Sequence, residues 1–252
     1  MSRKEEGRSA ADSRNVEVIT DYAQFPEGSA LYKSGNTWVL CNVSIDNRVK
    51  DFLRGQGRGW VTAEYSMLPR STTKRMFREG WKGKWPRGRS QEIQRLIGRS
   101  LRASVFSRRL GERTFIVDCD VIQADGGTRT ASVNGGFIAL AIALKREIDA
   151  GRVEPRPLCC IPAAVSVGIV DGEAVLDMNH AEDQSAQVDM NVVGSHDGRI
   201  IEIQGTAEGD PFTQSDFSRM MALALEEINR LCLITRSSLE NAGVDVDAML
   251  DR

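Results

Sequence analysis

The sequence predicts an α+β fold made of two related halves, each a set of strands followed by a helix. Three observations predict it. Apolar residues alternate over short stretches, each set of such stretches precedes a segment with helical periodicity, and a proline-containing linker at 152–157 separates the sets. With 252 residues, 41% of them hydrophobic, the chain can form a sizeable core. We expect a single domain over 1–252, in which residues 1–14 could form a disordered tail.

The strands of the first half share an alternation of apolar and polar residues. They are predicted at 16–25, 30–45, 60–65 and 114–123. A turn at 34–36 divides the second of them into a hairpin. A long basic loop over 67–89 leads into a helix with Ser90 as its N-cap candidate, and a further helix is predicted over about 130–150.

The second half repeats this order of strands before a helix. Its strands are predicted at 163–170, 174–178, 188–194 and 199–204. The final helix is expected to begin near Thr213 and to continue into the 230s, because apolar residues recur there at helical spacing. The midpoint of the duplication lies near 152–157, and we do not expect a true domain boundary there.

Cysteine and histidine are too few, or wrongly spaced, for several classes of site. The five cysteines form no C-x-x-C pair and the histidines are only His180 and His196, so a zinc cluster or a Ser-His-Asp site has little support. Buried thiols in a reducing cytoplasm are the simpler interpretation. The sequence has no run of about 18 apolar residues and no secretory signal at its start. We therefore expect a cytoplasmic protein without a membrane partner.

Charge is concentrated in one segment. The whole chain carries −2, but residues 70–102 contain 11 lysines and arginines against two glutamates, a local charge of +9. The remainder must then carry −11. Such a distribution indicates a local site for a polyanion on an otherwise acidic protein.

The turn at 125–129, which is Asp-Gly-Gly-Thr-Arg, has the composition of an anion site. Gly126 and Gly127 would let the backbone approach a ligand closely, and the helix that follows offers unpaired amides at its positive end. Thr128 and Arg129 would add a hydroxyl and a guanidinium. A simple glycine turn with Thr128 as the helix N-cap explains the same residues about equally well.

Two acids in the second half, Asp183 and Asp189, could hold a hard cation such as Mg²⁺. In one straight strand they would lie roughly 20 Å apart, so they can converge only if the chain bends near Ser185. Glu182 and Asp177 are local competitors for the same role. An exposed acidic loop is the alternative interpretation.

The basic loop combines cations with aromatic side chains, a pattern typical of single-stranded nucleic-acid binding. Its arginines include Arg70, Arg75 and Arg78, and its aromatic residues include Trp81 and Trp85. Tryptophans that anchor the loop to the core are an equally good explanation. The following helix carries a second basic stripe, Arg95, Arg99 and Arg102, for which a solvated helix face is the alternative.

Five ordered segments resemble the ribonuclease PH family of phosphate-dependent exoribonucleases. They are 59–72, 88–102, 118–131, 182–191 and 202–213. The resemblance runs from about Glu27 to the final helix. It implies two pseudo-symmetric halves of the kind found in ribosomal protein S5 domain 2, and a homohexameric ring that is a trimer of dimers.

The resemblance also implies roles for particular residues. Those that would bind the attacking inorganic phosphate are Arg89, Gly127, Thr128 and Arg129. Asp183 and Asp189 would be the catalytic acids with Mg²⁺ nearby. Those that would face RNA, or support the site and the dimer contact, are Arg70, Arg75, Arg78, Arg95 and Arg99.

Two departures from the family pattern stand out. Glu6-Gly7-Arg8 replaces an Asp-Gly-Arg-like segment, and Arg14 is followed by asparagine where the family has proline. The loop around 81–86 is unusual in composition and slightly longer. Neither departure touches the phosphate turn or the two acids.

From these features we expect a phosphorolytic 3′→5′ exoribonuclease that trims tRNA precursors and other RNAs with single-stranded 3′ ends. It would release nucleoside diphosphates, and the reverse reaction would add nucleotides from diphosphates. One alternative is a catalytically silent, exosome-like ring subunit that only binds RNA. The others are a hydrolytic nuclease that releases monophosphates and a structural protein without an RNA partner.

Overall fold

The computed structural model describes Arg3, residues 7–78 and residues 88–251, which form two sheets and four α-helices. The first sheet has the order β1-β2-β3-β5-β4, with β4 parallel to β5 and the other pairs antiparallel. Its strands are β1 (Val16–Thr20), β2 (Gly28–Ser34), β3 (Thr37–Asp46), β4 (Trp60–Met67) and β5 (Thr114–Gln123). The second sheet is antiparallel, with the order β7-β6-β8-β9. Its strands are β6 (Pro162–Val170), β7 (Glu173–Leu176), β8 (Val188–Ser195) and β9 (Ile200–Ala207).

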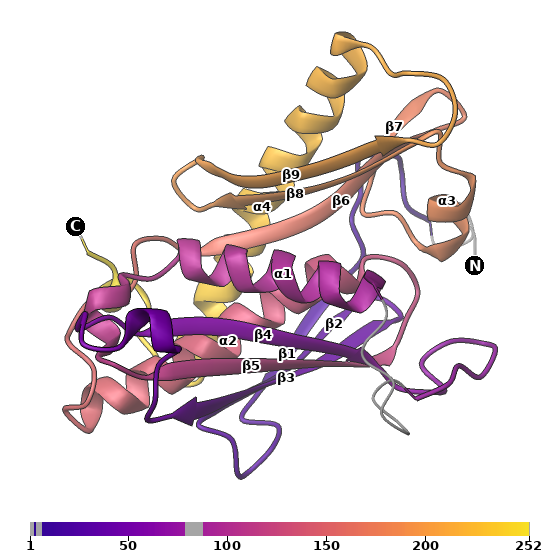
Figure 1. The fold of residues 1–252 in the computed structure, drawn as a ribbon. Coiled ribbons are helices and arrows are strands. Elements are labelled where there is room, and N and C mark those ends of the chain that lie inside the picture. The colour runs from indigo at the N-terminus through magenta and orange to yellow at the C-terminus, as the bar shows by residue number, and fades with distance from the viewer. Residues whose placement is uncertain (1–2, 4–6, 79–87, 252) are drawn as a thin grey trace.

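The helices arrange the molecule in layers (Figure 1). Helices α1 (Gly88–Ala103) and α2 (Thr128–Asp149) pack on the first sheet, and they contact the second sheet through β9 and β6 respectively. Helix α4 (Gln214–Asn241) packs on β6 and β8. A short helix, α3 (His180–Ser185), precedes β8. Three 3₁₀ helices complete the elements of the described part of the chain, at Asp51–Leu53, Ser107–Leu110 and Asp247–Met249.

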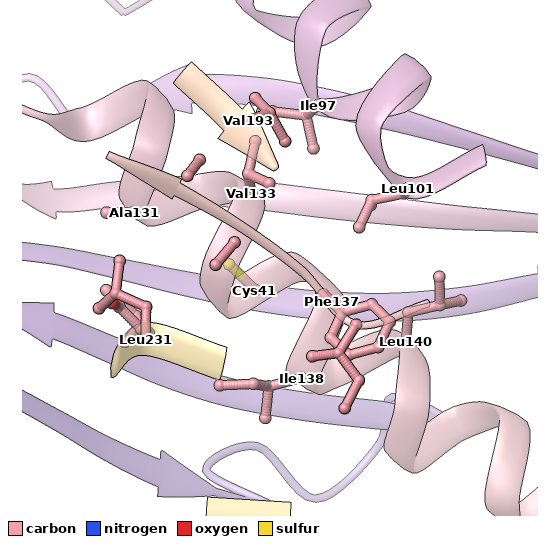
Figure 2. Packing of buried hydrophobic residues seen from close by; sticks show 14 of the residues in the cluster. Cys41, Ile97, Leu101, Ala131, Val133, Phe137, Ile138, Leu140, Val193 and Leu231 are labelled. Atoms are coloured by element: carbon pink, nitrogen blue, oxygen red, sulfur yellow. The ribbon is translucent and has the colours of Figure 1, made fainter. Parts of the chain in front are cut away.

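Helix α2 forms the centre of the core because both sheets contact it. Figure 2 shows its residues Val133 and Phe137 among apolar side chains from α1 and β8, including Ile97 and Val193. Gly135 allows α2 to lie close to β2, since a Cβ there would stand 2.8 Å from the Cβ of Tyr32. The two halves therefore share one core and pack as one body.

The predicted α+β fold of two strand-and-helix halves is confirmed. Apart from shifts of a few residues at the ends of other elements, three local predictions differ from the structure. Strand β1 ends at Thr20, because Asp21 adopts a positive φ of 52°. Helix α1 begins at Gly88, so Ser90 is a buried residue inside the helix and not its N-cap. Helix α3 occupies residues for which the sequence predicted no helix or strand.

The described part of the N-terminal segment is bonded to the second half. The backbone amide of Leu176 donates to the carbonyl of Ala10 at 2.8 Å. The Arg3 guanidinium bonds Glu182 at 2.7 Å, and Arg8 donates to the carbonyl oxygen of Asp177 at 3.3 Å. Arg3 and residues 7–14, part of the segment that on sequence alone could form a disordered tail, thus pack against the second half. Among the described helices, none is long and apolar enough to cross a membrane.

Candidate active site

A cavity of about 550 Å³ opens where the first half meets the second. The end of β5, the start of α2 and the start of α1 line it from the first half, and α3 with β8 lines it from the second. Figure 1 shows α3 and the start of α1 on the same side of the molecule. The predicted site residues that line the cavity are Arg70, Arg89, Gly127, Thr128, Arg129, Asp183 and Asp189.

The start of α2 leaves its backbone donors open toward this cavity. Gly126 and Gly127 have φ of 74° and 63°, which is left-handed backbone that favours glycine. Gly127 is the N-cap, and among the described side chains none caps the helix there. The interpretation of Thr128 as a simple N-cap is therefore wrong. The first amides of α2 can instead bind an anion, with support from the helix dipole.

Thr128 is the first residue of α2, and its hydroxyl lies 2.8 Å from the hydroxyl of Tyr65 on β4. Burial raises the pKa of Tyr65, so this phenol stays protonated and can donate to the Thr128 oxygen. The Thr128 hydroxyl proton then remains available for an anion. The predicted phosphate contact by Thr128 is compatible with this geometry.

Two arginines flank the same space. Arg89 is exposed near the start of α1, and Arg129 is more buried, with Nη1 3.9 Å from Oε1 of Glu92. The charges of both arginines act on Asp189, where they favour the ionised carboxylate. Cations from two different helices and the open amides of α2 thus converge on one cavity.

The two predicted acids also converge. Helix α3 ends at Ser185, the chain turns through Ala186, and β8 begins at Val188, so the bend that convergence requires is present. Asp183 and Asp189 then line the same cavity. Burial raises the pKa of Asp189, and the negative charge of Asp183 raises it further.

The competing acids have other partners. Asp177 forms a buried ion pair with Arg14, at 2.6 Å between Oδ1 and Nη2. Glu182 bonds Arg3 and closes a capping box with Asn179 at the start of α3. Four candidate acids in the sequence are thus reduced to two that face the cavity.

Comparison with known families agrees with this arrangement. A model for domain 1 of the 3′ exoribonuclease family RNase_PH matches residues 12–145, and a model for its domain 2 matches residues 160–227. The chain belongs to the ribonuclease PH family of 3′ exoribonucleases.

Solved structures share the fold of this family member at low identity. The crystal structure of rice (Oryza sativa) Rrp46 is 19% identical, covers 93% of this chain and 99% of its own, and has a TM-score of 0.74. An Archaeoglobus fulgidus exosome with RNA bound to the active site is 20% identical, covers 90% of each chain and has a TM-score of 0.76. An archaeal exosome core is 20% identical, covers 92% of this chain and 90% of its own, and has a TM-score of 0.73. At these identities the likeness concerns the fold.

In this ribonuclease PH family member, Asp183 and Asp189 could together hold a divalent cation. Burial, and after it the negative charge of Asp183, raises the pKa of Asp189, and a bound cation would offset both effects. Among the described residues, no cluster of three or more His, Cys, Asp or Glu side chains is arranged to hold a metal. Two carboxylates suit Mg²⁺, which completes its shell with water and substrate phosphate oxygens.

The remaining arginines predicted to face RNA lie outside the cavity lining. Arg75, Arg78 and Arg95 are exposed. Arg99 forms a salt bridge with Glu202 of β9, so its charge already has a partner that joins the two halves. The side chain of Phe77, next to Arg78, is 80% exposed. The predictions for Trp81 and Trp85 fall outside the described residues.

The cavity also includes residues that sequence reasoning missed. Asn191 lies two positions after Asp189 on β8, on the same face, and its Nδ2 lies 3.4 Å from Oδ1 of Asp189. The period of two along this strand could have identified it. His180 also lines the cavity, and its backbone amide donates to the Asp125 carboxylate at 3.3 Å. Without knowledge of α3, no sequence pattern pointed to His180.

Proposed function

We propose that this protein is a phosphate-dependent 3′→5′ exoribonuclease that trims the 3′ extensions of tRNA precursors and other RNAs with single-stranded ends. The observation that supports it most is the single cavity in which the open start of α2 lies with Arg89, Arg129 and the carboxylates of Asp183 and Asp189. A hydrolytic nuclease would not need an anion site of this kind beside its acids. Membership of the exoribonuclease family supports the same reaction class.

In the proposed reaction, inorganic phosphate occupies the start of α2. The amides after Gly127, the Thr128 hydroxyl and the Arg89 and Arg129 guanidinium groups would hold it. One of its oxygens attacks the phosphorus of the last phosphodiester, and the bond from that phosphorus to the 3′-oxygen of the preceding nucleotide breaks. The proton of the hydrogen phosphate dianion balances the leaving 3′-oxygen. The products are a nucleoside diphosphate and an RNA shortened by one nucleotide.

The protein contributes mainly position and charge to such a step. Arg89 and Arg129 would neutralise the two phosphate groups as they approach each other, and their fixed positions avoid reorganisation during the reaction. Mg²⁺, which Asp183 and Asp189 would hold, would supply further charge neutralisation when bound. Removal of divalent cations with a chelator is therefore expected to abolish nucleotide release while the fold remains intact.

RNA would approach across the basic surface around Arg70, Arg75, Arg78 and Arg95. These exposed side chains lie on the loop and helix that border the cavity, and Phe77 offers a stacking face beside them. We further propose a cytoplasmic homohexamer, a trimer of dimers, on the strength of the family resemblance. The five free cysteines suit a reducing compartment.

The test is incubation of the protein with a 3′-extended tRNA and Mg²⁺, with and without inorganic phosphate, followed by identification of the released nucleotides. We expect nucleoside diphosphates, and only when phosphate is present. Monophosphates in both reactions would make the protein a hydrolase. RNA binding without release would favour the catalytically silent, exosome-like ring subunit, an alternative raised by the exosome structures that share this fold.

A further inference from the structure

A buried arginine lies between the phosphate turn and the second half. The side chain of Arg14 is 4% exposed and that of its partner Asp177 is 8% exposed. Nε and Nη2 of Arg14 bond the two carboxylate oxygens of Asp177 at 2.8 and 2.6 Å, and the backbone amide of Arg14 bonds the same carboxylate at 2.8 Å. Such a bidentate pair has a fixed geometry that a lysine could not reproduce.

The same guanidinium reaches the turn that precedes α2. Nη1 of Arg14 donates to the carbonyl oxygen of Asp125 at 2.5 Å. Thr37 supports this contact from β3, because its hydroxyl donates to the carbonyl of Gly126 at 2.6 Å and accepts from the amide of Asp125 at 2.9 Å. Nη2 of Arg14 also lies 2.9 Å from the position that a Cβ on Gly127 would occupy. Arg14 therefore lies directly against the backbone that forms the proposed phosphate site.

On its other side, Arg14 holds the segment that leads into α3. Asp177 has a positive φ of 49°, and three residues later α3 begins at His180. This segment touches the turn itself, since a Cβ on Gly126 would collide with the carbonyl oxygen of Met178. Asp183, which faces the cavity, lies on the first turns of this helix.

We propose that Arg14 is a positioning residue. It fixes the position of helix α3, which carries Asp183, relative to the phosphate site at the start of α2. Its guanidinium bonds the Asp125 carbonyl in the first half of the molecule and the Asp177 carboxylate in the second half. This inference rests on the proposed phosphorolytic function, because it assigns Arg14 the task of aligning bound phosphate with Asp183 and Asp189. Arg14 itself is not among the residues that line the cavity.

The consequence of losing this contact is a small displacement of groups that must be aligned closely. A misplacement of about 1 Å in an active site can reduce the rate about 100-fold. Arg14→Lys keeps the charge but cannot bond both carboxylate oxygens and the Asp125 carbonyl together. We expect this variant to raise the KM for phosphate, and to reduce kcat/KM for phosphate about 100-fold, while its Kd for RNA stays unchanged.

Two further variants separate positioning from folding. Arg14→Gln combined with Asp177→Asn removes both buried charges, so neither is left unpaired. Its melting temperature should recover relative to Asp177→Asn alone, whereas its kcat/KM for phosphate should stay low. Thr37→Val keeps the ion pair and removes the hydroxyl that bonds the turn and also accepts from Nη1 of Arg14 at 3.4 Å, so a several-fold rise in the KM for phosphate is expected. Arg48→Lys is the matched control, because Arg48 forms a bidentate pair with Asp46 on the surface.

The experiment measures the Kd for inorganic phosphate by calorimetry, the melting temperature, and kcat and KM for phosphate and for RNA separately. Weakened phosphate binding in every folded Arg14 variant, with RNA affinity and the Arg48→Lys control unchanged, supports the proposal. Wild-type phosphate affinity and turnover in a folded Arg14→Lys variant would overturn it. Recovery of both stability and turnover in the double variant would also overturn it, since Arg14 would then be only structural. If the wild-type chain releases no diphosphate, the proposed function fails, and phosphate affinity alone still decides the role of Arg14.

Discussion

In each half of the molecule a set of strands is followed by a helix, α2 in the first half and α4 in the second. The N-termini of these two helices differ in their capping. Helix α2 begins after Gly127, which provides no side-chain cap, and its first turn contains no acid. Helix α4 begins after Thr213, whose hydroxyl accepts from the amide of Asp216 at 3.1 Å while Asp216 bonds back to Thr213 at 3.0 Å. Hydrogen bonds from Thr213 lower the pKa of Asp216 to about 2.

The difference suggests how a duplicated fold could carry the single anion site that we propose. A capping box bonds the amide of Asp216 at the start of α4 and places a negative charge beside the other amides there, so we expect this helix start to repel an anion. The uncapped start of α2 leaves its donors for a ligand. The second half contributes instead the acids that face this start, Asp183 and Asp189. In the proposed site, the first half therefore supplies the anion-binding groups and the second half supplies the acids.

The largest effect is expected from the acid on β8. Asp189→Asn removes one of the two carboxylates that face the start of α2, and turnover should fall on the order of 100-fold or more, equivalent to about 3 kcal/mol. The rate of phosphate-dependent nucleotide release measures it. Asp197→Asn is the control, because Asp197 follows the far end of the same strand and bonds Arg199 outside the cavity. Full turnover by Asp189→Asn would remove that residue from the site.

A pH-dependent loss of stability is expected from the buried Arg14–Asp177 ion pair next to the start of α2. Burial alone would raise the pKa of Asp177, but Arg14 outweighs it and holds this pKa below its ordinary value. A lowered pKa stabilises the folded state above about pH 3.9, and this contribution disappears as the pH falls through the folded-state pKa. Asp177→Asn should therefore cost about 3–5 kcal/mol near neutral pH.

Denaturant unfolding at several pH values measures this prediction. The difference in free energy of unfolding between the wild type and Asp177→Asn should shrink below about pH 4. A difference that stayed constant down to pH 2 would mean that the charge of Asp177 does not stabilise the fold.

A smaller effect is expected from the glycine that caps α2. Gly127→Ala places a side chain at φ 63°, a strain of about 1–2 kcal/mol, and brings a Cβ toward Arg14. Phosphate affinity should fall about tenfold, as calorimetry can measure. Gly198→Ala is a matched control, since Gly198 has φ of 80° and open space around its Cβ position. If both variants weakened phosphate binding equally, the effect would not belong to the start of α2.

The smallest effect on stability and phosphate binding is expected at the capped start of α4. Thr213→Ala removes the cap of α4 and should cost about 1 kcal/mol of stability. Phosphate affinity should not change, because the acid of this first turn remains. A second phosphate bound to the variant would show that the cap, and not the acid, excludes anions there.

Most elements of the fold could be predicted because they depend on local patterns. The range of β5 follows from alternation alone, and the turn at 125–129, singled out by its composition and position, lines the cavity. Convergence of Asp183 and Asp189 was predicted only on the condition of a bend near Ser185, which is present.

The features that escaped prediction depend on contacts between distant residues. Nothing near Asp177 in the sequence indicates that its partner is Arg14, 163 positions away. That pairing is also what removes Asp177 from the set of candidate metal ligands. Helix α3 spans only six residues, too few for a periodic pattern, and its capping box of Asn179 and Glu182 is a weak sequence signal because no apolar run follows it.

Calorimetric titration of inorganic phosphate into the wild type, Arg129→Gln and Arg219→Gln tests the central claim most directly. Arg129 lies in the first turn of α2, which has no side-chain cap. Arg219 lies near the start of α4, which has a capping box, and is paired with Asp216. We predict one phosphate per chain in the wild type, at least tenfold weaker binding in Arg129→Gln, and unchanged binding in Arg219→Gln. Phosphate binding that survives Arg129→Gln at full strength would contradict the assignment of the anion site to the start of α2.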